Sequence, residues 1–297
     1  MSSSSLSSWF SSSSPPPPPR PPRSQNSPNS PSQHIQTQHN RLVWLYQVLT
    51  ALCIMMVGWI LVAPGSMWHG RTKFHDETVT PMLNLSHDTL VPIDIVQKYI
   101  GHTAVHLTHV FPAAIWSAAI PFQFHKGFRK TRQTLHRRMG YAFFASSLLM
   151  AAGVVVIIRR KLMFESFYDD LPPPSALSSS IPTEVVLYAM NLYFVGTAAT
   201  AWKKAAIDKS FGEHQDWMIR HVASGMWVGI QRVLLAFIYI PMYKPPVPRE
   251  IQRESFGQAG QIGWFVSVAA GEYAIYLIHR NNKTINTKNT AVKAKAS

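Results

Sequence analysis

The feature that most constrains this sequence is a long run without any charged residue, over residues 42–63. As a helix rising 1.5 Å per residue it would be about 33 Å long, enough to cross a hydrocarbon core of about 30 Å. Five more apolar runs are of comparable length, at residues 100–124, 139–158, 184–202, 222–240 and 262–278. We therefore predict an all-α fold, a six-span transmembrane helical bundle over residues 41–280, with the lipid bilayer as its main partner. A soluble bundle would need unusually long core helices.

The charge content agrees with a lipid-covered surface. Only 14% of the residues are charged, against about 25% in a typical soluble domain. The mean hydropathy is nevertheless +0.00, because polar segments at the two ends offset the apolar runs. The single cysteine, Cys53, excludes an internal disulfide and a thiolate zinc finger.

The two ends of the chain have a different composition from the spans. Residues 1–40 are rich in Ser and Pro, contain no acidic residue and include five consecutive prolines at 15–19. Such a segment buries too little apolar surface to offset its ordering entropy, so we predict a disordered tail. Residues 281–297 are polar and basic, and we predict a flexible tail there as well.

The net charge of +14 is distributed unevenly between the segments that connect the spans. The two tails and the even-numbered loops carry about twice as many Lys and Arg residues as the odd-numbered loops. By the positive-inside rule, both termini are predicted to be cytoplasmic. Asn84, in an Asn-Leu-Ser sequon of the first loop, is then a glycosylation candidate. The basic excess is explained by topology and anionic lipid, and no nucleic-acid-binding motif is present; the sequence names no protein partner.

Ionisable residues inside a membrane are costly, so each one is a candidate for function. In the second span, His102, His106 and His109 lie on one helical face. This pattern suits ligation of a metal or haem by at least one of them. A proton or polar path and structural hydrogen bonding are the alternatives.

The fifth span carries a second group on one face. His214, His221, Gly225 and Arg232 all fall close to one line along a helix. Imidazole can ligate iron, glycine leaves room for a flat ring, and arginine pairs with carboxylates, so this set suits haem. The alternative is a packing glycine and an arginine bonded to backbone carbonyls. Glu272 in the sixth span needs a partner, for which we expect Arg232 or a histidine.

The third span begins with His136, and Gly140 follows on the same face. In the predicted topology, His136 lies at the same depth as His221 and His214. Two facing histidines on different helices are the ligand set of a b-type haem. We predict His136 and His221, with His214 as the alternative to His221, as axial ligands. Arg138 and Arg220 are the candidates to hold the haem propionates.

Two of these segments resemble a known family. The segment His-Arg-Arg-Met-Gly-Tyr at 136–141 looks like the HR-x-x-G-x-x-Y/F motif of the multi-pass membrane proteins called domain of unknown function 2306. The segment His-Gln-Asp-Trp-Met-Ile-Arg at 214–220, with the later Arg232, is similar to that family's second motif. His102 or His106 would correspond to its early histidine. The resemblance covers roughly residues 95–280 and implies the membrane architecture and these site residues, but no activity. The layout of histidines has a weaker likeness to transmembrane ascorbate-reducible cytochromes b.

Three functions remain open from the sequence. The first is electron transfer by a bound haem b, which would make the protein a membrane oxidoreductase. The second is a transporter or proton-coupled channel with a polar path through the membrane, built from His102, His106, His109, Arg232 and Glu272. The third is a structural or assembly protein whose histidines only form hydrogen bonds.

Overall fold

The computed structural model describes residues 31–62, 72–79, 81, 86–172 and 182–296. Within these ranges every regular element is a helix. Six helices are long and apolar enough to cross a membrane, which confirms the predicted fold of an integral membrane protein. They cover Gln36–Val62, Thr103–Phe124, Gln133–Arg159, Thr183–Ala206, Phe211–Met242 and Arg249–Thr284.

Several spans are assembled from more than one helical segment. The first, third, fourth and sixth spans lie in α1 (Pro31–Val62), α7 (Gln133–Arg159), α8 (Thr183–Ala206) and α11 (Arg249–Ala296). The second span runs through α4 (Thr103–Val105), a π-helical segment (His106–Val110) and α5 (Phe111–Phe124). The fifth runs through α9 (Phe211–Leu234), a second π-helical segment (Leu235–Tyr239) and α10 (Ile240–Met242). Short helices α3 (Ile93–Gln97) and α6 (Lys126–Thr131) lie in the connections.

Five of the six spans are longer than the apolar runs that predict them, and the second is shorter, beginning at Thr103 instead of residue 100. α7 begins at Gln133 and α9 at Phe211, each ahead of its apolar run. Hydropathy detects only the part of a helix that lies in the hydrocarbon core, whereas a helix continues through polar turns outside it. For this reason His136 and His214 lie in the first turns of their helices and not in the connecting loops.

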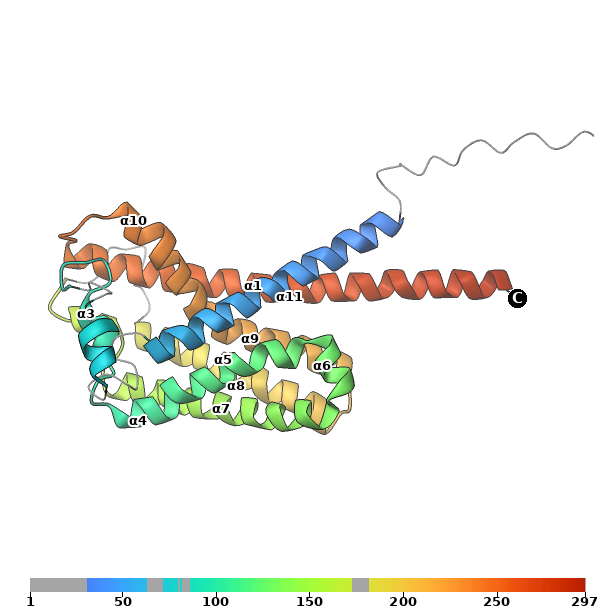
Figure 1. The fold of residues 1–297 in the computed structure, drawn as a ribbon, viewed down its shortest axis with the longest axis horizontal. Helices are drawn as coiled ribbons and strands as arrows, with labels where there is room; N and C mark the ends of the chain where they lie inside the picture. Colours follow the sequence, from blue (N-terminus) through green and yellow to red (C-terminus); the bar gives the residue numbers. More distant parts are fainter. Residues whose placement is uncertain (1–30, 63–71, 80, 82–85, 173–181, 297) are drawn as a thin grey trace, which may run out of the picture.

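Helices α5, α7, α8 and α9 form the centre of the bundle, and α1 and α11 pack along it (Figure 1). The most extensive contacts join α9 to α11, α8 to α9, α5 to α7 and α1 to α5. One end of the bundle carries α6, and we call it the α6 end; the opposite end carries α3 and α10, and we call it the α3 end (Figure 1). The start of α1 and the end of α11 both point toward the α6 end. That this end faces the cytoplasm stays a prediction.

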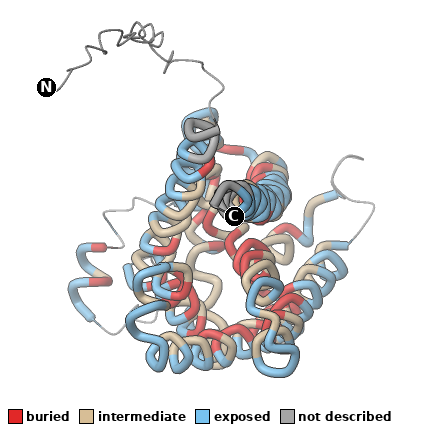
Figure 2. Tube along the Cα trace, turned by 90° about the vertical axis from the view of Figure 1, so that its right-hand side faces the viewer, coloured by how far each residue is buried: buried red, intermediate tan, exposed pale blue. Residues whose placement is uncertain are grey.

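Buried residues line the inside of the bundle and exposed residues its outside (Figure 2). Many of the outward side chains are large and apolar, including Ile54, Leu192 and Phe237, which are 68%, 74% and 76% exposed. In water such a surface would be an aggregation hazard. In a bilayer, lipid tails cover it at no cost.

The two predicted tails differ in outcome. Residues 1–30 of the predicted disordered segment lie outside the described residues, whereas residues 31–40 form the first turns of α1. In place of the predicted flexible tail over 281–297, α11 continues to Ala296. No Gly or Pro follows Gly271, so no residue interrupts this helix. The glycosylation candidate Asn84 lies outside the described residues.

Candidate functional site

His221 of α9 lies fully buried at the centre of the bundle. Its Nε2 atom is 2.9 Å from Oγ of Ser147 on α7 and 3.4 Å from Nε1 of Trp116 on α5. Its Nδ1 atom is 3.1 Å from the carbonyl oxygen of Phe194 and 3.3 Å from Oγ1 of Thr197, both on α8. A single imidazole therefore joins four helices.

These contacts fix the proton on the His221 ring. The Phe194 carbonyl can only accept a hydrogen bond, so Nδ1 of His221 carries the proton and donates it. Nε2 is then the acceptor, and the Trp116 indole N–H donates to it. A haem ligand must offer a free lone pair to the iron. Here the protein uses both ring nitrogens.

Aromatic rings also enclose His221. Its ring centroid lies 4.4 Å from that of Phe194, 5.5 Å from Phe143 and 6.0 Å from Trp116. A Cβ atom at Gly225 would lie only 2.6 Å from Cη2 of Trp116. Gly225 thus makes room for the indole, and not for a cofactor ring. His221 and Gly225 do not fit a haem, and we derive no step through a haem at this position.

His136 and His214 lie together at the α6 end, and their charges interact. Nδ1 of His214 donates to the carbonyl oxygen of Ala201 at 2.8 Å, which leaves its Nε2 as the lone-pair atom. Nδ1 of His136 is buried and has no hydrogen-bond partner within the described residues. The carbonyl of His136 accepts from Nε2 of Gln123 at 3.1 Å, which ties the start of α7 to α5. Two imidazole nitrogens are therefore available here, on two different helices.

The face of α7 next to His136 is open at Gly140. Gly140 lies one helical turn further along α7, on the same face. A Cβ built at Gly140 would meet no atom within 4 Å among the described residues. The two glycines that the sequence predicts as room for a cofactor therefore differ, since Gly225 is filled by Trp116 and Gly140 is open.

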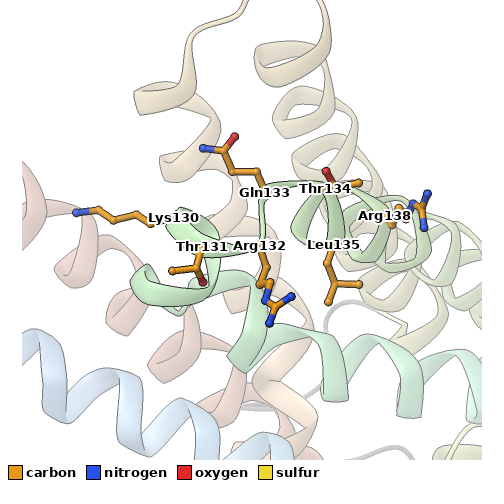
Figure 3. A pocket seen from close by; sticks show the side chains of 7 residues that line it. All are labelled: Lys130, Thr131, Arg132, Gln133, Thr134, Leu135 and Arg138. Atoms are coloured by element: carbon orange, nitrogen blue, oxygen red, sulfur yellow. The ribbon is translucent and has the colours of Figure 1, made fainter.

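Arg138 and Arg220 do not flank one cofactor. Arg138 is exposed and lines a shallow hollow at the turn between α6 and α7 (Figure 3). The hollow is lined by Lys130, Thr131, Arg132, Gln133, Thr134, Leu135 and Arg138. Three of these side chains are cationic and none is acidic, which suits anionic lipid headgroups at a membrane surface.

Arg220 is occupied by a partner on another helix. Its Nε and Nη2 atoms donate to the two carboxylate oxygens of Glu272 on α11, at 2.6 and 3.0 Å. The guanidinium also lies 4.9 Å from the centre of the Trp217 ring. The expectation that Glu272 pairs with Arg232 or a histidine is wrong, because α9 turns Arg220 toward α11. Glu272 therefore pairs with Arg220 and not with Arg232.

The histidines of the second span have separate partners. Nδ1 of His102 is 3.4 Å from Nη1 of Arg160, and Nδ1 of His109 is 3.3 Å from the carbonyl oxygen of Met150 on α7. His106 begins the π-helical segment between them. Across the described part of the chain, no three His, Cys, Asp or Glu side chains come together as a possible metal site. The structure therefore does not bring this triplet together as a ligand set.

Some residues near these sites carry no signal in the histidine pattern. The sequence does not single out Trp116 as a site residue, because a tryptophan in an apolar span is ordinarily a packing residue. Lys98 and Tyr99 lie in the turn just ahead of the second span, close enough to Arg232 for their charges to interact. Their position directly beside a histidine-rich span is the signal that could have found them.

Comparisons of the sequence with protein-family models, with curated proteins and with solved structures found no match. The resemblance to the domain of unknown function 2306 family stays a prediction, as does the weaker likeness to transmembrane cytochromes b. The candidate site therefore depends on its geometry alone.

Proposed function

We propose that this integral membrane protein binds a b-type haem through His136 and His214, at the α6 end of the bundle, and serves electron transfer there. The observation that carries the proposal is the buried, unpartnered Nδ1 of His136, at the same end of the bundle as a His214 ring whose own Nδ1 is already fixed and whose charge acts on His136. A ligating histidine commonly donates its other N–H to a backbone carbonyl, as His214 does. A bound haem would supply one-electron chemistry.

The protein's own residues would hold the two imidazoles in place. The Ala201 carbonyl sets the tautomer and the orientation of the His214 ring. Gln123 restrains the backbone at His136 from a neighbouring helix. Gly140 leaves space on the same face of α7. Of the cations nearby, Arg129 interacts electrostatically with His136, so it is a better candidate for an anionic propionate than Arg220, which Glu272 occupies.

The test is a reduced-minus-oxidised spectrum of the full-length protein, purified from cells supplied with a haem precursor. We expect a b-type band that is lost in His136→Ala and in His214→Ala. His279→Ala is the matched control, because His279 is an exposed histidine that pairs with Asp216 at 2.8 Å. We expect this variant to keep the band.

Two further measurements separate ligation from a structural role. Imidazole added to His136→Ala should restore part of the band if the lost group was a ligand, and should have no effect if the variant has only unfolded. Thermal midpoints check that each variant is folded. Absence of haem from the wild-type protein, or an unchanged spectrum in both ligand variants, would refute the proposal.

A further inference from the structure

A second group of polar residues lies at the α3 end, far along the bundle from His136 and His214. Lys98 and Tyr99 lie in the turn after α3, His109 in the π-helical segment and Arg232 near the end of α9. The charges of Lys98 and Arg232 interact with each other, and both act on His109. Three separate segments thus bring two cations and a histidine together.

Arg232 has hydrogen-bond donors that the protein does not use. Its Nη1 atom donates to the carbonyl oxygen of Val228 on its own helix, at 3.1 Å. Its Nε atom is buried and has no hydrogen-bond partner in the part of the chain that the structure describes. The ring of Trp59 lies 5.2 Å from the guanidinium carbon. A guanidinium has five N–H donors in one plane, so Arg232 retains donors for an acceptor that the protein itself does not provide.

The group also lacks a counter-charge. All 14 Asp and Glu residues of the chain lie in the described ranges, and none of them pairs with Lys98 or Arg232. Two neighbouring cations without a carboxylate are costly at the edge of a membrane. Burial, together with the charge of Arg232, lowers the pKa of Lys98 to about 7. An anion would relieve this repulsion, whereas a metal cation would add to it.

We propose that Lys98 and Arg232, beside His109, form a binding site for an oxyanion, the phosphate or carboxylate group of a small solute or of a lipid headgroup. The free donors of Arg232 match the oxygens of such a group. Lys98 adds a mobile point charge on a flexible stem. His109 borders this site without donating to the anion, because its Nδ1 donates the ring proton to the Met150 carbonyl at 3.3 Å and its Nε2 then carries a lone pair. The site uses none of the residues proposed to hold haem.

The experiment uses the full-length protein purified in a neutral detergent, without added haem. Two probes are titrated at constant ionic strength, inorganic phosphate and a short-chain phosphatidate. We expect each bound probe to raise the thermal midpoint, and Arg232→Gln and Lys98→Met to weaken the binding at least about tenfold. Arg159→Gln is the matched control, because Arg159 is an exposed arginine at the same end of the bundle. It should bind as the wild type does.

The two probes distinguish the sources of the anion. Similar affinities identify a soluble oxyanion, whereas a clear preference for phosphatidate identifies a lipid headgroup; either result supports the site. If Arg232→Gln does not fold, Lys98→Met gives the same test, because Lys98 lies in a turn outside the spans. No binding of either probe by the wild type, or equal binding by the wild type and Lys98→Met, would overturn the proposal.

Discussion

Replacing Gly225 by alanine tests whether the centre of the bundle is filled by protein. The added Cβ would lie 2.6 and 2.9 Å from two ring atoms of Trp116, and 3.0 Å from Cε2 of Phe194. Ordinary carbon contacts are about 3.5–4.0 Å. The indole cannot withdraw, since Trp116 is only 2% exposed and its ring is stacked on Phe143 with the centroids 5.5 Å apart.

The size of the effect follows from a comparison with Gly196→Ala. Gly196 lies in the interior of α8, and an added Cβ there would meet no atom within 4 Å among the described residues. Both substitutions gain about 1 kcal/mol in helix propensity, so this gain cancels between them. Overpacking of a filled core costs about 1–3 kcal/mol. We therefore expect Gly225→Ala to be less stable than Gly196→Ala by about 1–3 kcal/mol.

The assay is unfolding by a denaturing detergent, followed by tryptophan fluorescence, for both variants and the wild type without added haem. Gly196→Ala should equal or exceed the wild type in free energy of unfolding, and Gly225→Ala should fall below Gly196→Ala. Equal values for the two variants would refute the reasoning, because they would mean that Gly225 faces open space. A haem slot at Gly225 would then be possible again.

Two other predictions concern charged groups. Glu272→Gln removes the carboxylate that pairs with Arg220. Because both side chains are partly exposed, we expect the free energy of unfolding to fall by about 1 kcal/mol or less. A larger loss in the same unfolding assay would contradict this expectation. The affinity for sulfate, an oxyanion whose own charge does not change near neutral pH, should decrease as the pH rises through 7, because Lys98, with a pKa of about 7, loses its charge there. Of the groups facing it, Arg232 keeps its charge, Tyr99 stays neutral because burial raises its pKa to about 12, and the neutral ring of His109, which donates its proton to the Met150 carbonyl, adds no charge. Titrations from about pH 6 to 8 should therefore show a decrease that Lys98→Met abolishes; an equal decrease in that variant would contradict the role of Lys98.

The spans could be predicted from the sequence, because crossing a bilayer requires only length and low polarity. Helix ends could not be placed, since polar turns such as the one that carries His136 continue the helix outside the apolar core. Matched depth predicts His136 with His221, or with His214 as the alternative, and His136 and His214 both lie at the α6 end. Depth alone does not predict that aromatic side chains enclose His221.

A single sequence does not show which side chains on different helices contact one another. His221 meets its partners on α5, α7 and α8, and a helical projection of α9 alone cannot show them. Glu272 was expected to find Arg232, but the rotation of α9 against α11 selects Arg220. Lys98 and Arg232, whose charges interact, lie far apart in the sequence, so no helical projection brings them together.

The position of His221 has a consequence for how the chain enters the membrane. Every residue that hydrogen-bonds its ring, from Trp116 to Thr197, precedes it in the chain. A lone imidazole among lipid tails leaves two polar nitrogens unsatisfied. The fifth span is therefore stable at full depth only after the earlier spans have assembled. Among the central helices α5, α7, α8 and α9, we expect α9 to pack last during membrane insertion.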